Sequence, residues 1–475
     1  MSITLAGALL IPLTLLVLVI APNRLGQCAI VVSSLAAASV VNIGGGFAVG
    51  ISPYFFAAAV IAARIVTRLA TGRIRFGAGE PILGHVRTLA LFVAWGVVSA
   101  MILPVLFTGM PVDLGRAGVD ATFFAMVPLH WTFSNAGQAG YLVLDLCLVL
   151  LFLRNASRPG YIEGLVEAFT WTGLIVVGVG AYQILSNRLH LPFPKAFLYS
   201  NQVWAELDGE GIAGWQRINA TFPEASAAGD FLAMWSVFEL VLAARSGRQG
   251  VKHWWFALAG SFMVANTTST TGYVTLGLAW TLFIWKYVLA PLLEGRVAVK
   301  SLLAAALIVV AIVAAFASGK DSSTLLSLVL FNKLQTSSAT HRFASVYHSG
   351  GIFLQSFGLG VGLGSDRALS SAAYILANLG VVGVVLFAYL LWQLYALGKG
   401  RNLAGSEGRQ ERIWFEALGW ALVVQIMAMM ESGAEITGPA LWIPWAILAA
   451  IVRRNWLRTA RTDASLIAHA YPASA

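Results

Sequence analysis

The chain has 475 residues, of which 58% are hydrophobic and only 11% are charged, and its mean hydropathy is +0.78. A soluble globular domain carries about 25% charged residues, so this composition excludes a large water-facing surface. The net charge of +9 does not indicate nucleic-acid binding, because the basic residues lie in short clusters between apolar runs and form no single stripe.

Apolar runs recur along the whole chain, and most approach the ~20 residues that a helix needs to cross ~30 Å of hydrocarbon. The sequence therefore predicts an all-α, polytopic transmembrane bundle with about 12–14 spans. No basic residue precedes the first run, so we expect a retained span instead of a signal peptide. The candidate spans are approximately 3–20, 26–41, 51–67, 88–107, 137–153, 164–186, 226–244, 254–267, 272–290, 301–317, 372–394, 413–430 and 437–452.

Basic residues predict the orientation of these spans. Clusters such as 64–75, 245–252 and 453–461 fall in every second loop, and the intervening loops hold few Lys or Arg residues. By the positive-inside rule, the basic side is cytoplasmic. We therefore expect a bacterial inner-membrane protein with a periplasmic N-terminus and a cytoplasmic C-terminus. Its expected parts are N-terminal helices over 1–160, a membrane domain over 161–455 and a cytoplasmic tail over 456–475.

The two cysteines, Cys28 and Cys147, lie inside apolar runs without a partner nearby in the sequence. We interpret them as small hydrophobic residues and expect neither a disulfide nor a metal site. The short basic loops contain no Gly-x-x-x-x-Gly-Lys motif, so the sequence does not indicate an ATPase, and no cofactor is expected.

The longest loops are expected on the outer side, at 108–136, 187–225 and 318–371, and loops on a rigid scaffold tend to carry sites. The second loop ends with Arg217 and Glu224 directly before a span. An interfacial ion pair is the simpler interpretation of these two charges. The third loop includes an apolar stretch, 324–334, which is expected to lie on the membrane as an interfacial helix.

The third loop also carries His341, Arg342 and His348, followed by a Gly-rich run and Arg367. Gly-x-Gly steps allow backbone N–H groups to approach an anion closely, although a re-entrant connection is the alternative interpretation. Guanidinium groups bind phosphate bidentately and keep their charge when partly buried, so three outer arginines suit a lipid diphosphate. The glycines expected to contact this substrate are Gly360, Gly362 and Gly364.

Other polar positions have simpler interpretations. Asp145 and Glu239 lie within predicted spans, where a carboxylate is either functional or a partner in helix packing. The hydroxyl-rich run 267–271 predicts a tight outer turn whose side chains satisfy backbone groups. Glu431 and Glu435 are expected at an outer turn, exposed or lining a groove.

These elements together resemble the O-antigen polymerase and ligase superfamily, including Wzy-type exopolysaccharide polymerases. Arg217 followed by Phe222-Pro-Glu224-Ala-Ser226 is similar to the family's Arg…Phe-Glu-Pro-Ser element, with Pro and Glu exchanged. The segment from His341 to Asn378-Leu-Gly380 resembles the family's large periplasmic loop and the helix after it, and 269–272 resembles a recurring Ser-x-x-Gly turn. The resemblance covers about residues 160–450.

The resemblance implies a GT-C-like, metal-independent glycosyltransferase that uses polyprenyl-diphosphate-linked sugars at the periplasmic face. A ligase would usually show a His-Asn pair after the Gly-rich run, and the absence of His from 370–374 favours a polymerase. Arg217 and Arg342, with Arg367, would stabilise the leaving diphosphate, and Glu224, His341 or His348 would accept the proton.

The expected partners are an undecaprenyl-diphosphate-linked glycan, the lipid bilayer, a chain-length regulator and a flippase. Three alternatives remain open at this point. They are ligase-type glycan transfer to lipid or protein, a secondary transporter or lipid flippase, and a non-catalytic assembly subunit.

Overall fold

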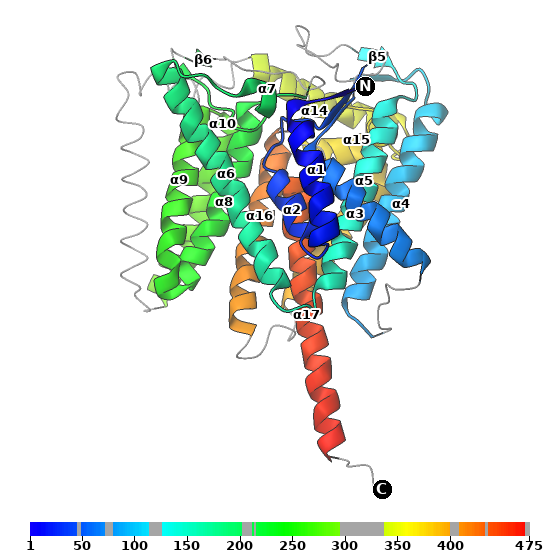
Figure 1. Ribbon diagram of the computed structural model, residues 1–475. Coiled ribbons are helices and arrows are strands. Elements are labelled where there is room, and N and C mark those ends of the chain that lie inside the picture. Colours follow the sequence, from blue (N-terminus) through cyan, green and yellow to red (C-terminus); the bar gives the residue numbers. More distant parts are fainter. Residues whose placement is uncertain are drawn as a thin grey trace.

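The computed structural model describes residues 1–44, 49–71, 79–113, 126–201, 211–212, 215–294, 337–399, 408–432 and 436–470. Its helices run mostly side by side in one bundle, with the N-terminus at one end and the C-terminal helix projecting from the other (Figure 1). We call these the upper end and the lower end. The described strands contain only two or three residues each, so the predicted all-α class is confirmed.

The first half of the described chain alternates between the two ends through short connections. Small strands pair at the upper end, in the order β1-β2-β3 and as β4-β5. The elements are β1 (Ser2–Ile3), α1 (Leu5–Ile20), α2 (Leu25–Val32), β2 (Val41–Ile43), β3 (Val49–Ile51), α3 (Pro53–Ala70), α4 (Ile82–Leu106), β4 (Pro111–Asp113), β5 (Met126–Pro128), α5 (Phe133–Asn155), α6 (Tyr161–Leu189) and α7 (Lys195–Leu198).

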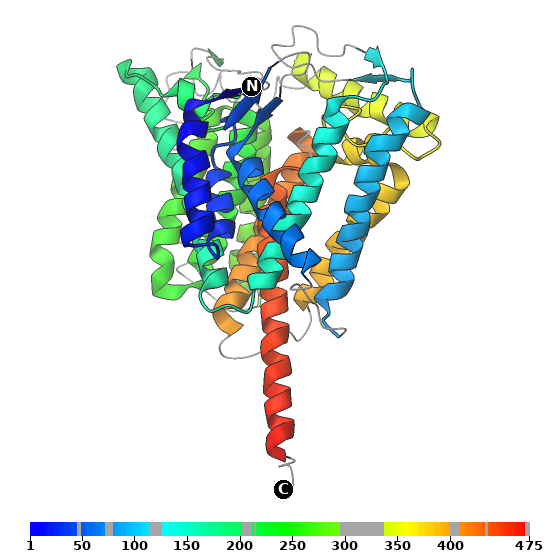
Figure 2. The same ribbon diagram turned by 45° about the vertical axis from the view of Figure 1, so that its right-hand side comes forward.

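The second half begins with the pair β6-β7 and continues with the remaining helices of the bundle. One of them, α14, lies across that end at a steep angle to the long helices (Figure 2). The elements are β6 (Gly211–Ile212), β7 (Trp215–Gln216), α8 (Ala225–Arg245), η1 (Gly247–Gly250), α9 (Val251–Thr267), α10 (Thr270–Ile284), η2 (Trp285–Leu289), α11 (Ala290–Leu293), α14 (Ser337–Gln355), α15 (Ser371–Lys399), α16 (Gly408–Ser432) and α17 (Pro439–Ala470).

Within the described ranges, eight helices are long and apolar enough to cross a membrane, so a multi-pass membrane protein is confirmed at this level. They are α3, α4, α5, α6, α8, α15, α16 and the continuous run Thr270–Leu293. Helices α1, with 16 residues, and α9, with 17, are shorter. The predicted span 301–317 and the predicted interfacial helix 324–334 lie outside the described residues.

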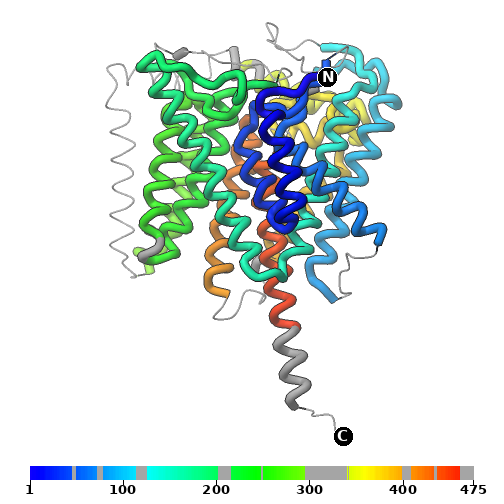
Figure 3. Tube along the Cα trace, viewed as in Figure 1, coloured from blue at the N-terminus to red at the C-terminus, as the bar shows by residue number. Residues whose placement is uncertain are grey.

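The helix predicted to cross over 26–41 is wrong, because the helix there, α2, ends at Val32. The hydroxyls of Ser33 and Ser34 donate to the carbonyls of Ile30 and Val31, 2.6 and 2.7 Å away, where the helix ends. The chain then continues through turns to β2, which pairs with β1 and β3. The chain thus descends from the upper end through α1 and returns to it through α2 and the turns that follow (Figure 3).

The outer surface of the bundle is apolar, as a lipid-facing surface must be. On α15, large side chains are exposed at a spacing of three or four residues, which places them along one helix face: Val381, Val385, Tyr389, Trp392 and Tyr395. A stripe of this length would promote aggregation in water, whereas hydrocarbon solvates it.

Helix α8 lies at the centre of one half of the bundle, and 89% of the residues in its 18-residue apolar stretch are buried. Its Trp235 is fully buried between α6 and α9. A Cβ on Gly173 of α6 would lie 2.0 Å from the indole ring, and one on Gly260 of α9 would lie 3.0 Å from it. Small residues therefore allow these helices to approach closely, as is usual for packing in membranes.

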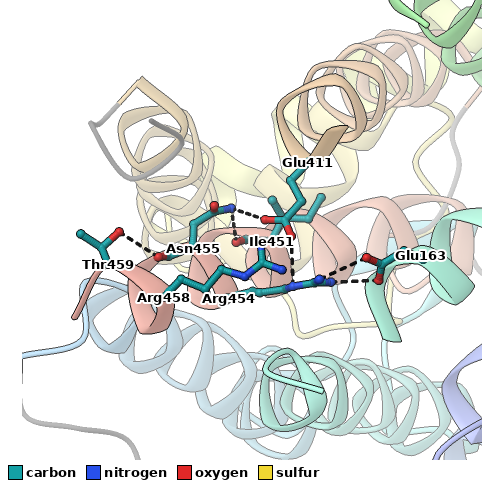
Figure 4. A network of polar contacts seen from close by, with 7 residues as sticks. All are labelled: Glu163, Glu411, Ile451, Arg454, Asn455, Arg458 and Thr459. Atoms are coloured by element: carbon teal, nitrogen blue, oxygen red, sulfur yellow. Dashed lines mark hydrogen bonds and ion pairs between the residues drawn. The ribbon is translucent and has the colours of Figure 1, made fainter. Parts of the chain in front are cut away.

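At the lower end, charged side chains join α17 to three other segments. The Arg453 guanidinium bonds both oxygens of Glu80, at 2.8 and 3.1 Å. Arg454 pairs with Glu163 of α6 and with Glu411 of α16, and Arg458 also reaches Glu411 (Figure 4). These bonds fix the position at which α17 leaves the bundle.

The glycine contacts around Trp235 predict a position-specific effect on stability. Gly173→Ala should lower the free energy of unfolding by about 1–3 kcal/mol, because the new methyl group overlaps the indole of a fully buried side chain. The thermal unfolding midpoint of the purified protein in detergent measures this loss. Gly178→Ala, on the same helix, should leave the midpoint unchanged, because its methyl group would meet no atom within 4 Å. Equal midpoints for both variants would contradict the close packing.

Candidate functional site

The connection between β7 and α8, which carries Arg217 and Glu224, is fixed by bonds to other elements. The side-chain oxygen of Gln183, on α6, accepts from the N–H groups of Asn219 and Ala220 at 3.2 and 2.8 Å. Ala220 adopts φ 52°, a left-handed conformation that is uncommon for a residue with a Cβ. The segment enters α8 with Glu224 as the residue before the helix.

A buried carboxyl group lies just inside this helix. Asp230, in the second turn of α8, is only 5% exposed, and its Oδ1 has no hydrogen-bond partner among the described residues. Its charge interacts with those of Glu224, Arg342 and Glu431, and the Ser432 hydroxyl lies within hydrogen-bonding range of it. The structure thus brings two predicted site residues, Glu224 and Arg342, to a common carboxyl group.

Arg342 reaches this position from α14, which crosses the upper end. Its guanidinium donates to the backbone carbonyl of Glu431, near the end of α16. A guanidinium holds its positive charge in such a half-buried setting, whereas a lysine would lose it more readily. Helices α8, α14 and α16 therefore meet at one polar cluster, which we call the Asp230 cluster and define as Glu224, Asp230, Arg342, Glu431 and Ser432.

Arg217 lies beside the turn between α9 and α10. Its Nε donates to the Thr267 carbonyl at 3.3 Å. The same turn packs on α8, where a Cβ on Gly229 would lie 3.2 Å from the Thr267 hydroxyl. Gly229 directly precedes Asp230, so the turn that Arg217 contacts packs on the same part of α8 as the Asp230 cluster.

The turn itself behaves as the sequence predicts. The Ser269 hydroxyl caps α10 by accepting from the N–H of Gly272 at 3.4 Å, and the Thr267 hydroxyl donates to the Val264 carbonyl at 2.7 Å. Side-chain oxygens therefore satisfy backbone groups between two helices that follow each other closely.

The Gly-rich run is a tightly bonded connection between α14 and α15. Gly358, Gly360, Gly362 and Gly364 all have positive φ, between 77° and 101°, which glycine adopts without steric cost. The N–H groups of Gly360 and Gly362 donate to Ser356 Oγ and to the Asn378 carbonyl, at 3.0 and 2.9 Å. Both N–H groups are thus bonded within the protein. These bonds do not support the predicted contact of Gly360 and Gly362 with an anion.

Asn378 of α15 holds this connection in place. Its fully buried amide accepts from the N–H groups of Ser365 and Asp366 and donates to the carbonyls of Asp366 and Tyr374, at 2.9–3.0 Å. Two residues later, Gly380 has φ 63° and ψ −162° and kinks α15. The kink opens space for the loop, since the Gly358 carbonyl there accepts from the N–H of Val381.

His348 and Arg367 lie at a second carboxylate, Asp366. The Asp366 oxygens accept from the Asp113 N–H at 3.1 Å and from the Ser349 hydroxyl at 3.0 Å, and His348 interacts with its charge. Arg367 donates its backbone N–H to the Asp113 carbonyl, and its side chain is exposed. The side chain of His341 lies outside the described residues, as does Glu435.

Two further carboxylates lie deep within the bundle, each in a specific pair. The Tyr54 hydroxyl donates to Asp145 at 2.6 Å, and Glu239 bonds the His253 ring at 2.5 Å. Asp145 and Glu239 are fully buried. These pairs link α3 to α5 and α8 to α9, a geometry that fits helix packing, one of the two interpretations that the sequence left open for them.

No family model matches the chain, and no curated protein matches it. Among the described residues, no three His, Cys, Asp or Glu side chains lie together in a way that could hold a metal ion. Sequence reasoning does not single out Asp230. The sequence feature that could have identified it is its position inside a predicted span, six residues after Glu224. A carboxylate within a membrane span often has a functional role.

The buried Asp366 predicts a pH dependence of stability. Burial raises the pKa of Asp366 to about 6, above its ordinary value of 3.8, although its hydrogen bonds oppose the shift. The native state therefore binds the proton more tightly than the unfolded chain, and this group's contribution to stability should decline as the pH rises from about 4 to 6. The decline should amount to roughly 3 kcal/mol at most.

Asp366→Asn removes the titrating proton and retains a polar side chain of similar shape. The difference in unfolding midpoint between this variant and the wild type should change across pH 4–6, and it should be constant between pH 7 and 8. A difference that stays constant over the whole range would show that Asp366 does not titrate there.

Proposed function

We propose that the chain polymerises undecaprenyl-diphosphate-linked oligosaccharide repeat units into a surface or exopolysaccharide, at the periplasmic face of the inner membrane. The observation that carries this proposal is the Asp230 cluster, in which a buried carboxyl group lies beside an arginine at the end of a lipid-facing helix bundle. The resemblance of the sequence to O-antigen polymerases supports the same class, with a flippase and a chain-length regulator as its partners.

The reaction needs one base and stabilisation of one leaving group. An acceptor sugar hydroxyl attacks the anomeric carbon of the donor glycan, a new glycosidic C–O bond forms, and the C–O bond to undecaprenyl diphosphate breaks. The diphosphate departs with the bonding electron pair, and its negative charge is stabilised by the guanidinium groups of Arg217 and Arg342. No oxidant or reductant is required.

The hydroxyl proton passes to a carboxylate of the Asp230 cluster. Asp230 is the best candidate of the three acids in the cluster, because it is buried and one of its oxygens has no hydrogen-bond partner among the described residues. Glu224 is half-buried at the start of α8 and would orient the acceptor. The kinked α15 and the Gly-rich connection hold α14, and with it Arg342, in place.

Arginine variants test the proposed diphosphate contacts. Arg217→Ala and Arg342→Ala should each lower chain extension about 10²–10³-fold, because the leaving diphosphate loses a fixed positive charge. The assay uses purified protein with lipid-linked repeat units in vesicles and no ion gradient, and a glycan ladder is the readout. Arg188→Ala is the matched control, since this arginine is exposed at the same end and is not part of the cluster. Full-length polymer from both site variants would contradict the proposal.

Neutral variants of the two acids separate the proton acceptor from the orienting residue. Asp230→Asn should lower the turnover number about 10²-fold or more with little change in KM, because it removes the base. Glu224→Gln should mainly raise KM for the acceptor. The opposite pattern, with Glu224→Gln losing turnover and Asp230→Asn retaining it, would assign the base to Glu224.

A transporter or flippase is the second candidate, and the deeply buried Asp145–Tyr54 and Glu239–His253 pairs favour it, since ionisable groups within membranes often carry ions. The gradient-free vesicle assay separates the two functions. A polymerase forms the ladder without a gradient, whereas a transporter moves lipid-linked units and forms no new glycosidic bond.

A further inference from the structure

A cavity of about 200 Å³ lies at the lower end, far from the Asp230 cluster along the bundle. It is formed between the connection from α5 to α6 and the part of α17 that leaves the bundle. Its lining contains two arginines and few other polar groups: Ser157, Pro159, Arg454, Leu457 and Arg458. This combination places positive charge beside an apolar wall.

Two more arginines next to the cavity have guanidinium nitrogens without an acceptor. Arg158 lies between the lining residues Ser157 and Pro159, and Arg154 lies one turn earlier in α5. In the described part of the chain, Nη1 of each is buried and has no hydrogen-bond partner. A buried guanidinium nitrogen is costly without an acceptor, so both groups favour an anionic ligand.

The positive charge around the cavity exceeds the negative charge. Glu163 and Glu411 pair with Arg454 and Arg458 (Figure 4). Arg158 also experiences the like charge of Arg64 on α3. Glu163 and Glu411 are already paired, so the positive charge that they do not balance belongs to the remaining arginines at this level: Arg64, Arg154 and Arg158.

The level of the cavity indicates what the anion is. Residues 453–455 of α17 are buried, 456–458 are half-buried and 459–460 are exposed, so the cavity lies where the helix passes from the bundle into water. In a membrane, lipid phosphates occupy this level. Basic pockets between helices on the cytoplasmic side bind anionic lipid head groups, and the positive-inside rule places the lower end on that side.

We propose that this cavity binds a phosphate group, supplied by an anionic phospholipid of the inner leaflet, and that Arg158 and Arg154 beside it supply the positive charge that Glu163 and Glu411 do not balance. Pro159 and Leu457 contact the glycerol region of the same lipid. The ligand occupies a site of its own, so the proposal stands whether or not the chain polymerises glycans.

Lipid binding to the purified full-length protein tests the site. In a neutral detergent, native mass spectrometry with added dioleoylphosphatidylglycerol should show one tightly held lipid per chain, and dioleoylphosphatidylcholine should not replace it. Arg158→Gln should weaken this binding about tenfold, as expected for the loss of one charged contact of ~1.4 kcal/mol. Arg158→Lys should bind with intermediate affinity, because it keeps the charge and loses the bidentate geometry.

Matched controls distinguish a built site from general attraction. Arg188→Gln removes an exposed arginine at the upper end of α6 and should leave the lipid affinity unchanged. Equal losses for Arg158→Gln and Arg188→Gln, or an unchanged affinity for Arg158→Gln, would overturn the proposal. The thermal midpoint of each variant without added lipid shows that it is folded, and Arg154→Gln serves as a second test if Arg158→Gln is not.

Inorganic phosphate distinguishes the two sources of the anion. Millimolar phosphate should compete weakly with the phosphatidylglycerol, because it lacks the apolar contacts. If phosphate alone stabilised the protein as strongly as the lipid, and Arg158→Gln abolished both effects, the ligand would be a free phosphate compound and the lipid assignment would be wrong.

Discussion

In a bilayer, a polar backbone or side-chain group finds no water and must be satisfied by the protein itself. This constraint explains the most irregular part of the upper end. The connection between α14 and α15 departs from helical geometry at four glycines, yet the amide of Asn378 bonds the backbone of Ser365 and Asp366. At the kink of α15, the N–H of Val381 donates to the Gly358 carbonyl at the start of the connection. The loop is therefore a rigid support, and it fixes the helix that carries Arg342.

The same constraint makes each buried polar group that is left incompletely bonded energetically costly. In the packed interior, Asp145 and Glu239 each bond a partner on a neighbouring helix through one carboxylate oxygen, and the other oxygen of each has no partner among the described residues. At the upper end, Asp230 has an unbonded oxygen, within the described residues, beside Arg342 and Glu224. A buried carboxylate with spare acceptor capacity is costly to keep, so its position near an arginine is consistent with a chemical role.

The two ends of the bundle use arginine in different ways. At the lower end, Arg453 and Arg454 join α17 to Glu80, Glu163 and Glu411 through paired carboxylates, and this anchors the helix that projects from the bundle. At the upper end, Arg217 and Arg342 donate to backbone carbonyls, and Arg342 also lies near the carboxyl groups of Asp230 and Glu431. A carbonyl orients a guanidinium without neutralising it, and this arrangement suits recognition of an anion such as a diphosphate.

The sequence by itself determined the class of the protein, because hydropathy, charge content and the alternation of basic loops depend only on local composition. It also determined the turn at 267–271 and most of the long helices. The tertiary structure decided the rest. The length of an apolar run did not reveal that α2 ends after Val32, since the strand pairing that returns the chain to the upper end joins residues far apart in the sequence. Nor did spacing reveal that Glu224 and Arg342 share Asp230 while His348 faces Asp366. Those neighbours are set by how helices α8, α14 and α16 pack, and packing is a property of the whole fold.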